Sequence, residues 1–181
     1  DAPAIDEQGV GEPAPLPGKV FTDPAEECPP ADELRAVLEG LTLVGHDGIV
    51  MQAQEALASV AVVGIYFSGH WCPPCRGFTP KLASTYMSLL GSRPGEFEVI
   101  FVSSDRSEEQ FAGYFGEMPW KYAVPYADGG ARQRLGELFK VQGIPTLCLV
   151  TPAGHTVAMD GRSKVAEDAQ GANFPWGSLT P

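Results

Sequence analysis

Residues 70–76 read HWCPPCR, so Cys72 and Cys75 stand two residues apart with a pair of prolines between them. This stretch follows the apolar run 61–67, AVVGIYF, which is continuous enough to predict a strand buried on both faces. A helix is predicted to begin at Pro73, because proline is favoured in the first turn of a helix. Such a pair of cysteines can be half of a metal site, a structural disulfide or a redox centre.

The other cysteines weigh against the first two of these readings. Structural zinc needs four ligands. His70 precedes the pair, but Cys28 lies in a Pro-rich segment and Cys148 in a predicted core strand, so a second pair at zinc-site spacing is missing. A disulfide that closes so small a loop constrains the unfolded chain little. We therefore expect no metal and no bound cofactor, only a redox-active disulfide between Cys72 and Cys75.

The start of the predicted helix assigns different roles to the two cysteines. Free N–H groups and the positive end of the helix dipole stabilise an anion at this place, and a thiolate is such an anion. Trp71 on one side and Pro73 and Pro74 on the other are expected to leave the Cys72 sulfur exposed, while Cys75 lies deeper. We expect Cys72 to attack a substrate disulfide and Cys75 to resolve the mixed disulfide.

A second signal lies much later in the chain, where residues 141–150 read VQGIPTLCLV. Ile144 and Pro145 stand just before a predicted strand. About 5–6% of X–Pro bonds in folded proteins are cis, and such bonds are usually conserved features of a fold. Together with the Trp-Cys-x-x-Cys motif, this position predicts a cis Ile144–Pro145 bond.

Strands and helices alternate along the rest of the chain. Hydrophobic periodicity predicts helices over 31–41, 52–60, 73–90, 107–115, 131–141 and 163–170. Further strands are predicted over 98–104, 123–128 and 146–151, with hairpins at 43–51 and at 146–160. The pattern implies an α/β fold, with a central mixed sheet flanked by helices on both faces and an N-terminal hairpin extension.

Composition limits the classes of partner. The 181 residues suffice for one domain with a single core. The 12 basic and 23 acidic residues give a net charge of −11, which argues against binding nucleic acid or anionic lipid. No apolar run approaches the roughly 20 residues that cross a bilayer. Residues 1–31 predict an irregular, Pro-rich acidic arm, and residues 32–181 the folded domain.

These motifs resemble the thioredoxin superfamily. The resemblance consists of Trp-Cys-x-x-Cys after a buried strand, Pro80 five residues past Cys75, and Gly-Ile-Pro-Thr before a later strand. In that family the cis-proline, here Pro145, faces the cysteine pair and orients the substrate chain. The similarity narrows to the nucleoredoxin and tryparedoxin branch on three stretches, YFSGHWCPPCRGFTPKL (66–82), VSSDRSEEQFAGYFGEMPW (102–120) and GANFPW (171–176).

Two departures refine the resemblance. Ordinary thioredoxins carry a buried Asp six residues before the first cysteine, as proton acceptor for the second thiol, and Tyr66 stands there instead. Asp105, or water, is the substitute that we expect. Tryparedoxins carry an acidic residue, suited to the cationic dithiol trypanothione, where this chain has Arg106. The cation would repel that dithiol, which favours nucleoredoxin.

The resemblance implies a thiol–disulfide oxidoreductase that reduces protein disulfides. Electrons are expected from a thioredoxin-reductase-like enzyme or a small thiol, and the protein is expected to be a monomer without nucleic-acid or membrane partners. The alternatives are a redox-gated binding module, a tryparedoxin-like electron carrier to peroxidases, and an oxidase or isomerase. The residues expected to orient substrate are Trp71, Pro73, Pro74, Ile144 and Pro145, with Tyr66, Arg76, Asp105 and Trp120 as auxiliaries.

The expected location is the cytoplasm, the nucleus or both. The numbering starts at Asp1 without an initiator methionine. An organelle is therefore the alternative, if a transit peptide has been removed.

Overall fold

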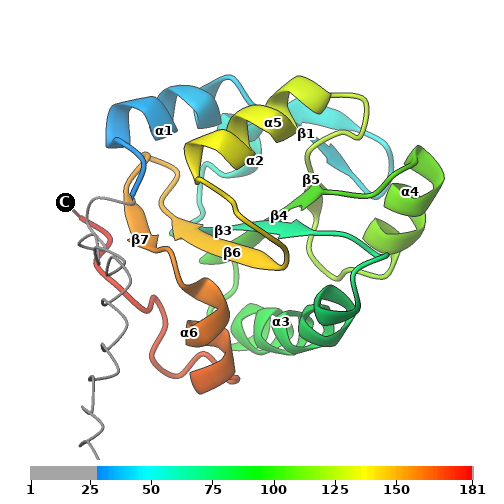
Figure 1. Cartoon of the computed structure of the whole chain (residues 1–181). Coiled ribbons are helices and arrows are strands. Elements are labelled where there is room, and N and C mark those ends of the chain that lie inside the picture. The colour runs from blue at the N-terminus through cyan, green and yellow to red at the C-terminus, as the bar shows by residue number, and fades with distance from the viewer. Residues whose placement is uncertain (1–27, 181) are drawn as a thin grey trace, which may run out of the picture.

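A seven-stranded mixed sheet lies at the centre of the computed structural model, which describes residues 28–180 (Figure 1). The strand order is β2-β1-β5-β4-β3-β6-β7. The strands are β1 (Thr42–Gly45), β2 (Val50–Gln52), β3 (Val62–Ser68), β4 (Phe97–Ser103), β5 (Tyr122–Ala123), β6 (Thr146–Val150) and β7 (Thr156–Ala158).

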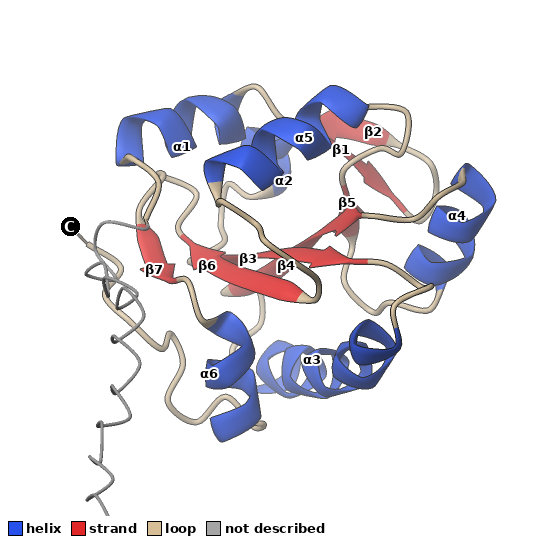
Figure 2. Cartoon of the chain, in the orientation of Figure 1, coloured by secondary structure: helices blue, strands red, loops and turns tan. Residues whose placement is uncertain are grey.

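Helices cover both faces of this sheet (Figure 2). One face is covered by α1 (Ala31–Glu39), α2 (Ala53–Ala56) and α5 (Gly129–Leu138). The other face is covered by α3 (Pro73–Ser92), α4 (Glu108–Gly116) and α6 (Gly161–Glu167). The predicted fold class is confirmed, including the N-terminal hairpin, which forms the β2–β1 edge of the sheet.

The central strands bring distant parts of the chain to one end of the sheet. β3 and β4 run parallel and are buried along their whole length, because helices pack on both faces. Ser68 at the end of β3 pairs with Ser103 at the end of β4. β6 runs antiparallel to β3, so its first residue, Thr146, pairs with Phe67. The segments that follow β3 and β4 and precede β6 therefore meet at this end.

Two predictions about single elements have different outcomes. The helix predicted over 107–115 is confirmed as α4, which Ser107 caps by accepting a hydrogen bond from the Gln110 N–H at 3.2 Å. The predicted strand over 123–128 is wrong, since β5 covers Tyr122–Ala123 alone. Pro125 has no N–H to donate to a neighbouring strand. Asp128 instead caps α5 by accepting from Ala131 N at 2.9 Å.

The two ends of the described region concern the predicted N-terminal arm and the C-terminal tail. Residues 1–27, most of the predicted N-terminal arm, lie outside the described residues, and α1 begins at Ala31. At the other end, Trp176 packs the tail onto the domain, with its ring centroid 5.8 Å from that of Phe97 and its indole N–H donating to Asp168. Between residues 28 and 180, no helix is both long and apolar enough to cross a membrane.

Candidate active site

Cys72 occupies the N-cap position of α3. Its backbone is extended, with φ −93° and ψ 112°, and its sulfur accepts a hydrogen bond from the Cys75 N–H at 3.3 Å. Pro73 and Pro74 fill the next two positions, where a missing N–H removes no helical hydrogen bond. The predicted helix start is confirmed. The first cysteine sulfur lies where a helix N-terminus presents its free donors.

Both cysteines are buried residues. Cys72 is 5% exposed and Cys75 0% exposed. Cys75 is the deeper of the two, as predicted, but the expectation of an exposed Cys72 sulfur is wrong. The Cys72 Sγ lies 3.7 Å from the Ile144 carbonyl oxygen, so the loop before β6 contacts this sulfur directly.

The loop before β6 brings the predicted proline to the cysteines. The Ile144–Pro145 bond is cis, as predicted from the sequence. Because β6 pairs with β3, this loop lies beside the start of α3. Arg162 of α6 donates a hydrogen bond from Nη1 to the Pro145 carbonyl at 3.1 Å. This hydrogen bond links the loop before β6 to α6.

Trp71 forms an exposed rim next to Cys72. Its side chain is 43% exposed, yet it is fixed, because its indole N–H donates to the Ser104 carbonyl at 2.8 Å. The Arg106 guanidinium lies 5.0 Å from the ring centroid, within the range of a cation–π contact. Gly69 allows this arrangement, since a Cβ there would lie 2.8 Å from the indole nitrogen. The exposed Trp71 ring beside Cys72 therefore carries the positive charge of Arg106 next to it.

Asp105 is buried and fixes the loop that precedes the cysteines. Its Oδ1 accepts from the His70 backbone N–H at 2.8 Å, and its Oδ2 accepts from the Ser103 hydroxyl at 2.8 Å. Arg76 supports the same loop by donating from Nη1 to the His70 carbonyl at 3.0 Å. Both Asp105 oxygens are thus engaged away from Cys75. These contacts favour a positioning role for Asp105 and give no support to the predicted proton transfer.

Replacing Asp105 with Ala is expected to loosen this loop. The His70 N–H would lose its buried acceptor, at a cost of about 1–3 kcal/mol. We expect a lower free energy of unfolding in urea and slower attack by Cys72 on a disulfide. Asp105→Asn, which keeps an oxygen for His70, should retain most of both. Equal behaviour of the Ala variant and the unmodified chain would contradict this role.

Cys75 is a neutral thiol at physiological pH. Burial above all raises its pKa to about 11, and the hydrogen bond with Cys72 acts in the same direction. Cys148, in the core strand β6, is also fully buried, and burial raises its pKa to about 12. Before Cys75 can attack a disulfide, it has to lose its proton in a site that disfavours the thiolate.

Three residues that the sequence analysis did not select lie beside Cys75 and the predicted Tyr66. They are Ser68, Thr79 and Tyr114, which are buried and linked by hydrogen bonds between their hydroxyls. The sequence pattern could have indicated Ser68 and Thr79, because they are polar residues at positions where the apolar pattern requires burial. No sequence pattern indicated Tyr114, because it lies in α4 and its contact with Thr79 spans 35 residues of sequence.

Trp120 was predicted to assist at the surface that receives substrate, and this prediction is wrong. It is fully buried, and its ring packs edge-on against Tyr66, at 5.7 Å between centroids, and against Tyr86, at 6.1 Å. Its indole N–H has no hydrogen-bond partner in the described part of the chain. Trp120 lies just before β5, and its ring belongs to the hydrophobic core between the sheet and α3.

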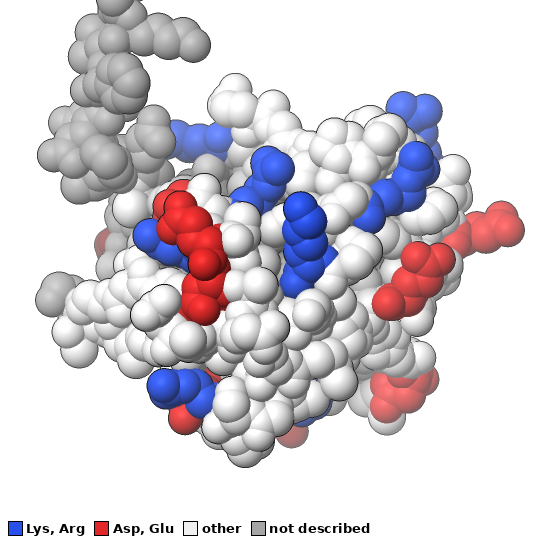
Figure 3. Space-filling view, turned by 90° about the horizontal axis from the view of Figure 1, so that it is seen from below, with Lys and Arg blue, Asp and Glu red and all other residues white. Residues whose placement is uncertain are grey.

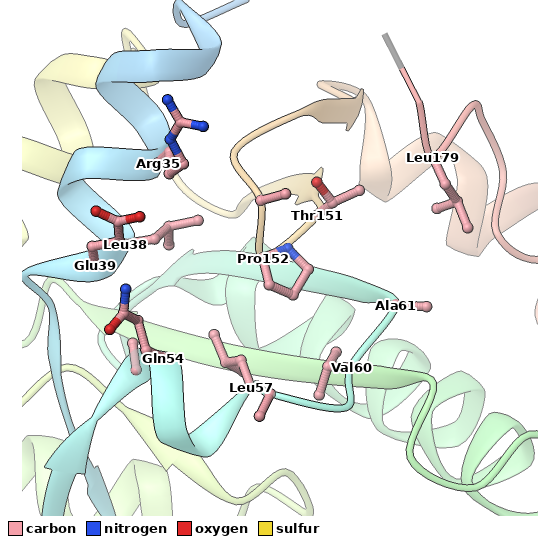
Figure 4. Close-up of a pocket in the computed structure, with 13 residues that line it drawn as sticks. Arg35, Leu38, Glu39, Gln54, Leu57, Val60, Ala61, Thr151, Pro152 and Leu179 are labelled. Atoms are coloured by element: carbon pink, nitrogen blue, oxygen red, sulfur yellow. The ribbon is translucent and has the colours of Figure 1, made fainter.

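Two other features of residues 28–180 lie apart from the cysteines. A cavity of about 520 Å³ opens between α1, α2 and the β6–β7 turn (Figure 4). Its lining includes Val60 and Ala61, which precede β3, whereas the cysteines follow the other end of that strand. Within the described range, no group of three or more His, Cys, Asp or Glu side chains is arranged to hold a metal ion.

The geometry defines a protein class. A dithiol at a helix N-terminus, beside a cis-proline at the same end of a mixed sheet, is the arrangement expected of the thioredoxin fold, and residues 61–156 match the family model described as thioredoxin-like. The chain therefore belongs to the thioredoxin-like family and has the fold of that family. Within the family it falls in the branch of nucleoredoxins and tryparedoxins.

Individual relatives support that placement. Mouse nucleoredoxin is 51% identical over 114 residues, which are 63% of this chain and 26% of the relative. Tryparedoxin from Trypanosoma brucei brucei is 44% identical over 115 residues, covering 63% of this chain and 78% of the relative. The crystal structure of tryparedoxin I from Crithidia fasciculata is 41% identical, with a TM-score of 0.71 over 81% of this chain and 99% of that one. The chain spans about a quarter of the length of the nucleoredoxins that it matches.

Proposed function

We propose that the chain is a protein-disulfide reductase of the nucleoredoxin type. The observation that carries the proposal is the position of Cys72, which caps α3, faces the cis Ile144–Pro145 loop and has Cys75 one turn behind it. The helix N-terminus supplies donors to a thiolate, and the proline loop supplies backbone to an extended substrate chain. No bound cofactor is needed for this chemistry.

The proposed cycle has two exchange steps. The Cys72 thiolate attacks one sulfur of the substrate disulfide, the substrate S–S bond breaks, and the departing thiolate takes a proton from water. Cys75 then loses its proton and attacks Cys72 Sγ, which releases the second substrate thiol and leaves a Cys72–Cys75 disulfide. An external dithiol, or a reductase that resembles thioredoxin reductase, returns the two electrons.

The surface beside the site favours a partner other than a cationic dithiol. Figure 3 shows the face that carries α3 and α6, where Lys and Arg side chains run across the middle and Asp and Glu side chains lie to either side. Lys81 and Arg162 line a groove of about 540 Å³ between these helices, and Arg106 stacks on Trp71. Cations at these places repel a positively charged thiol.

A second candidate function is that of an electron carrier to peroxidases, as expected for a tryparedoxin-like protein. It is favoured by the 78% of the T. brucei tryparedoxin that the match covers. One tryparedoxin II structure, 32% identical to this chain, is described as complexed with glutathionylspermidine. The two candidates differ in the reductant and the acceptor that they use.

We expect the location in the cell to be the cytoplasm, the nucleus or both.

The direct test is catalysis with a defined protein disulfide. We expect catalytic amounts of the chain to accelerate reduction of insulin by dithiothreitol well above the uncatalysed rate. The reduction potential should lie near the roughly −270 mV of reductases, and a value near −120 mV would indicate an oxidase instead. Rapid oxidation by a peroxidase, with no acceleration of insulin reduction, would favour the carrier function.

A further inference from the structure

Arg106 is an exposed cation next to the cysteine loop. Its guanidinium lies 5.0 Å from the centroid of the Trp71 ring. The ion pairs formed between residues 28 and 180 are Arg93–Glu96 and Lys164–Asp160, so Arg106 is not paired with a carboxylate in this range. Within the same range its side chain donates no hydrogen bond, and only its backbone N–H does so. The N–H donors of this guanidinium are therefore available to a partner.

The other two arginines near the cysteines have structural contacts instead. Arg76 donates to the His70 carbonyl at 3.0 Å, and Arg162 donates to the Pro145 carbonyl at 3.1 Å. Each of these guanidinium groups holds a loop of the site. Arg106 is thus the arginine beside the site whose side-chain donors are not used by the described fold.

The position of Arg106 is fixed relative to the cysteine loop. Ser104 N donates to the Ser68 carbonyl at 2.8 Å, and the Trp71 indole N–H donates to the Ser104 carbonyl at 2.8 Å. The Arg106 N–H donates to Gln110 Oε1 at 3.2 Å. These contacts hold the ring and the backbone that carries the cation before a substrate arrives, which lowers the entropy cost of binding.

The Trp71 ring meets the loop before β6 next to Cys72. A Cβ at Gly69 would lie 2.8 Å from the Trp71 indole nitrogen and 3.4 Å from Ile144 Cδ1, so the two side chains approach the same point. The Ile144 carbonyl oxygen lies 3.7 Å from Cys72 Sγ. A substrate chain that runs along this loop with its disulfide at Cys72 therefore brings its flanking residues toward Trp71 and Arg106.

A carboxylate is the group that suits this cation best. A guanidinium stacked on an aromatic ring still presents its planar edge, which can donate two parallel hydrogen bonds to one carboxylate. Glu108 and Glu109, in the first turn of α4, form no ion pair with Arg106 in the described part of the chain. Both oxygens of Asp105 accept hydrogen bonds from other groups. The net charge of −11 opposes acidic partners only weakly at contact, because exposed charges are screened beyond about 8 Å at physiological salt.

We propose that Arg106 recognises a carboxylate side chain beside the attacked disulfide, so that the substrates are proteins with Asp or Glu next to a disulfide cysteine. The inference rests on the proposed function, in which Cys72 attacks a protein disulfide, and it adds the class of substrate. Arg106 takes no part in the exchange of sulfur bonds. It binds the segment that carries the disulfide and orients it toward Cys72.

Three short peptides test this preference. Each is the homodisulfide of Gly-X-Cys-X-Gly, with Glu, Gln or Lys as X. The measured quantity is the rate constant for oxidation of the reduced chain at neutral pH and physiological salt. It is divided by the rate constant for reduction of the same peptide by dithiothreitol, which corrects for the reactivity of each disulfide. We expect the Glu peptide to exceed the Gln peptide roughly threefold to fivefold, as for an exposed ion pair, and the Lys peptide to react slowest.

Substitutions at Arg106 should change the order of the peptides. Arg106→Gln should remove the preference for Glu over Gln, and Arg106→Glu should make the Lys peptide react fastest. Arg93→Glu is the matched control, because it makes the same change of charge at the far end of α3, a helix of 20 residues. It should leave the order unchanged, since such a helix spans about 30 Å, well beyond the screening length. The uncharged bis(2-hydroxyethyl) disulfide should react equally with every variant, which checks that Cys72 is intact.

The outcomes separate this inference from the proposed function. An unchanged ratio of the Glu to the Gln peptide in Arg106→Gln would overturn the role of Arg106, as would an equal reversal in Arg93→Glu. A loss confined to reduction of glutathione disulfide, with equal rates for the three peptides, would assign Arg106 to small anionic disulfides and contradict the class of substrate. In all of these cases the chain still reduces disulfides. Failure of the unmodified chain to react with any peptide, together with no acceleration of insulin reduction, would instead contradict the proposed function.

Discussion

Replacing Cys72 with Ser is expected to lower reduction of a protein disulfide to the uncatalysed rate. The hydroxyl of serine is not ionised at the N-terminus of α3 at neutral pH, and it does not exchange with a disulfide. The side chain is nearly the same size and 5% exposed, so the fold should be retained. Insulin reduction by dithiothreitol measures the loss, and urea unfolding checks the fold.

Cys28→Ser is the matched control for this experiment. Cys28 precedes α1, on the opposite face of the sheet from α3, and it is partly exposed. The same substitution there should leave turnover unchanged. If Cys72→Ser also keeps full affinity for a cellular partner and supports the same cellular role, the chain acts as a redox-gated binding module and the reductase function is wrong.

The features that the sequence predicted correctly depend on local signals. Pro73 after an apolar run fixes the start of a helix, and the periodicity of residues 73–90 fixes its buried side. Ile144–Pro145 just before an apolar strand, seen together with the cysteine motif, indicated the cis bond. In each case the physical cause, a missing N–H or a repeat of apolar residues, lies within a few positions of its effect.

The features that were missed depend on contacts between distant segments. Nothing near Trp120 in the sequence shows that its ring packs against Tyr66 and Tyr86. The exposure of Cys72 depends on the Ile144 carbonyl, 72 residues further along the chain. The role of Asp105 depends on its contact with the backbone of His70, which is not marked by side-chain type. Such contacts follow from the strand order, which a single sequence does not specify.

Cys75→Ser is expected to convert a transient mixed disulfide into a stable product. Cys72 still attacks, but serine at the inner position does not resolve the bond, so the partner stays attached to Cys72. The inner position is 0% exposed and serine is slightly smaller than cysteine, which preserves the packing around α3. Non-reducing electrophoresis and intact mass should show one adduct per chain, which disappears on addition of dithiothreitol.

The double variant Cys72→Ser/Cys75→Ser is the control, and it should form no adduct. An adduct that persists in the double variant would place the reactive thiol at Cys28 or Cys148 and contradict the mechanism. Burial of Cys72 adds a further expectation about what is captured. Because Cys72 is only 5% exposed and its sulfur lies against the Ile144 carbonyl, trapped partners should present their disulfide on an exposed, extended segment that can lie along the Pro145 loop, and disulfides buried in folded domains should be captured only after denaturation.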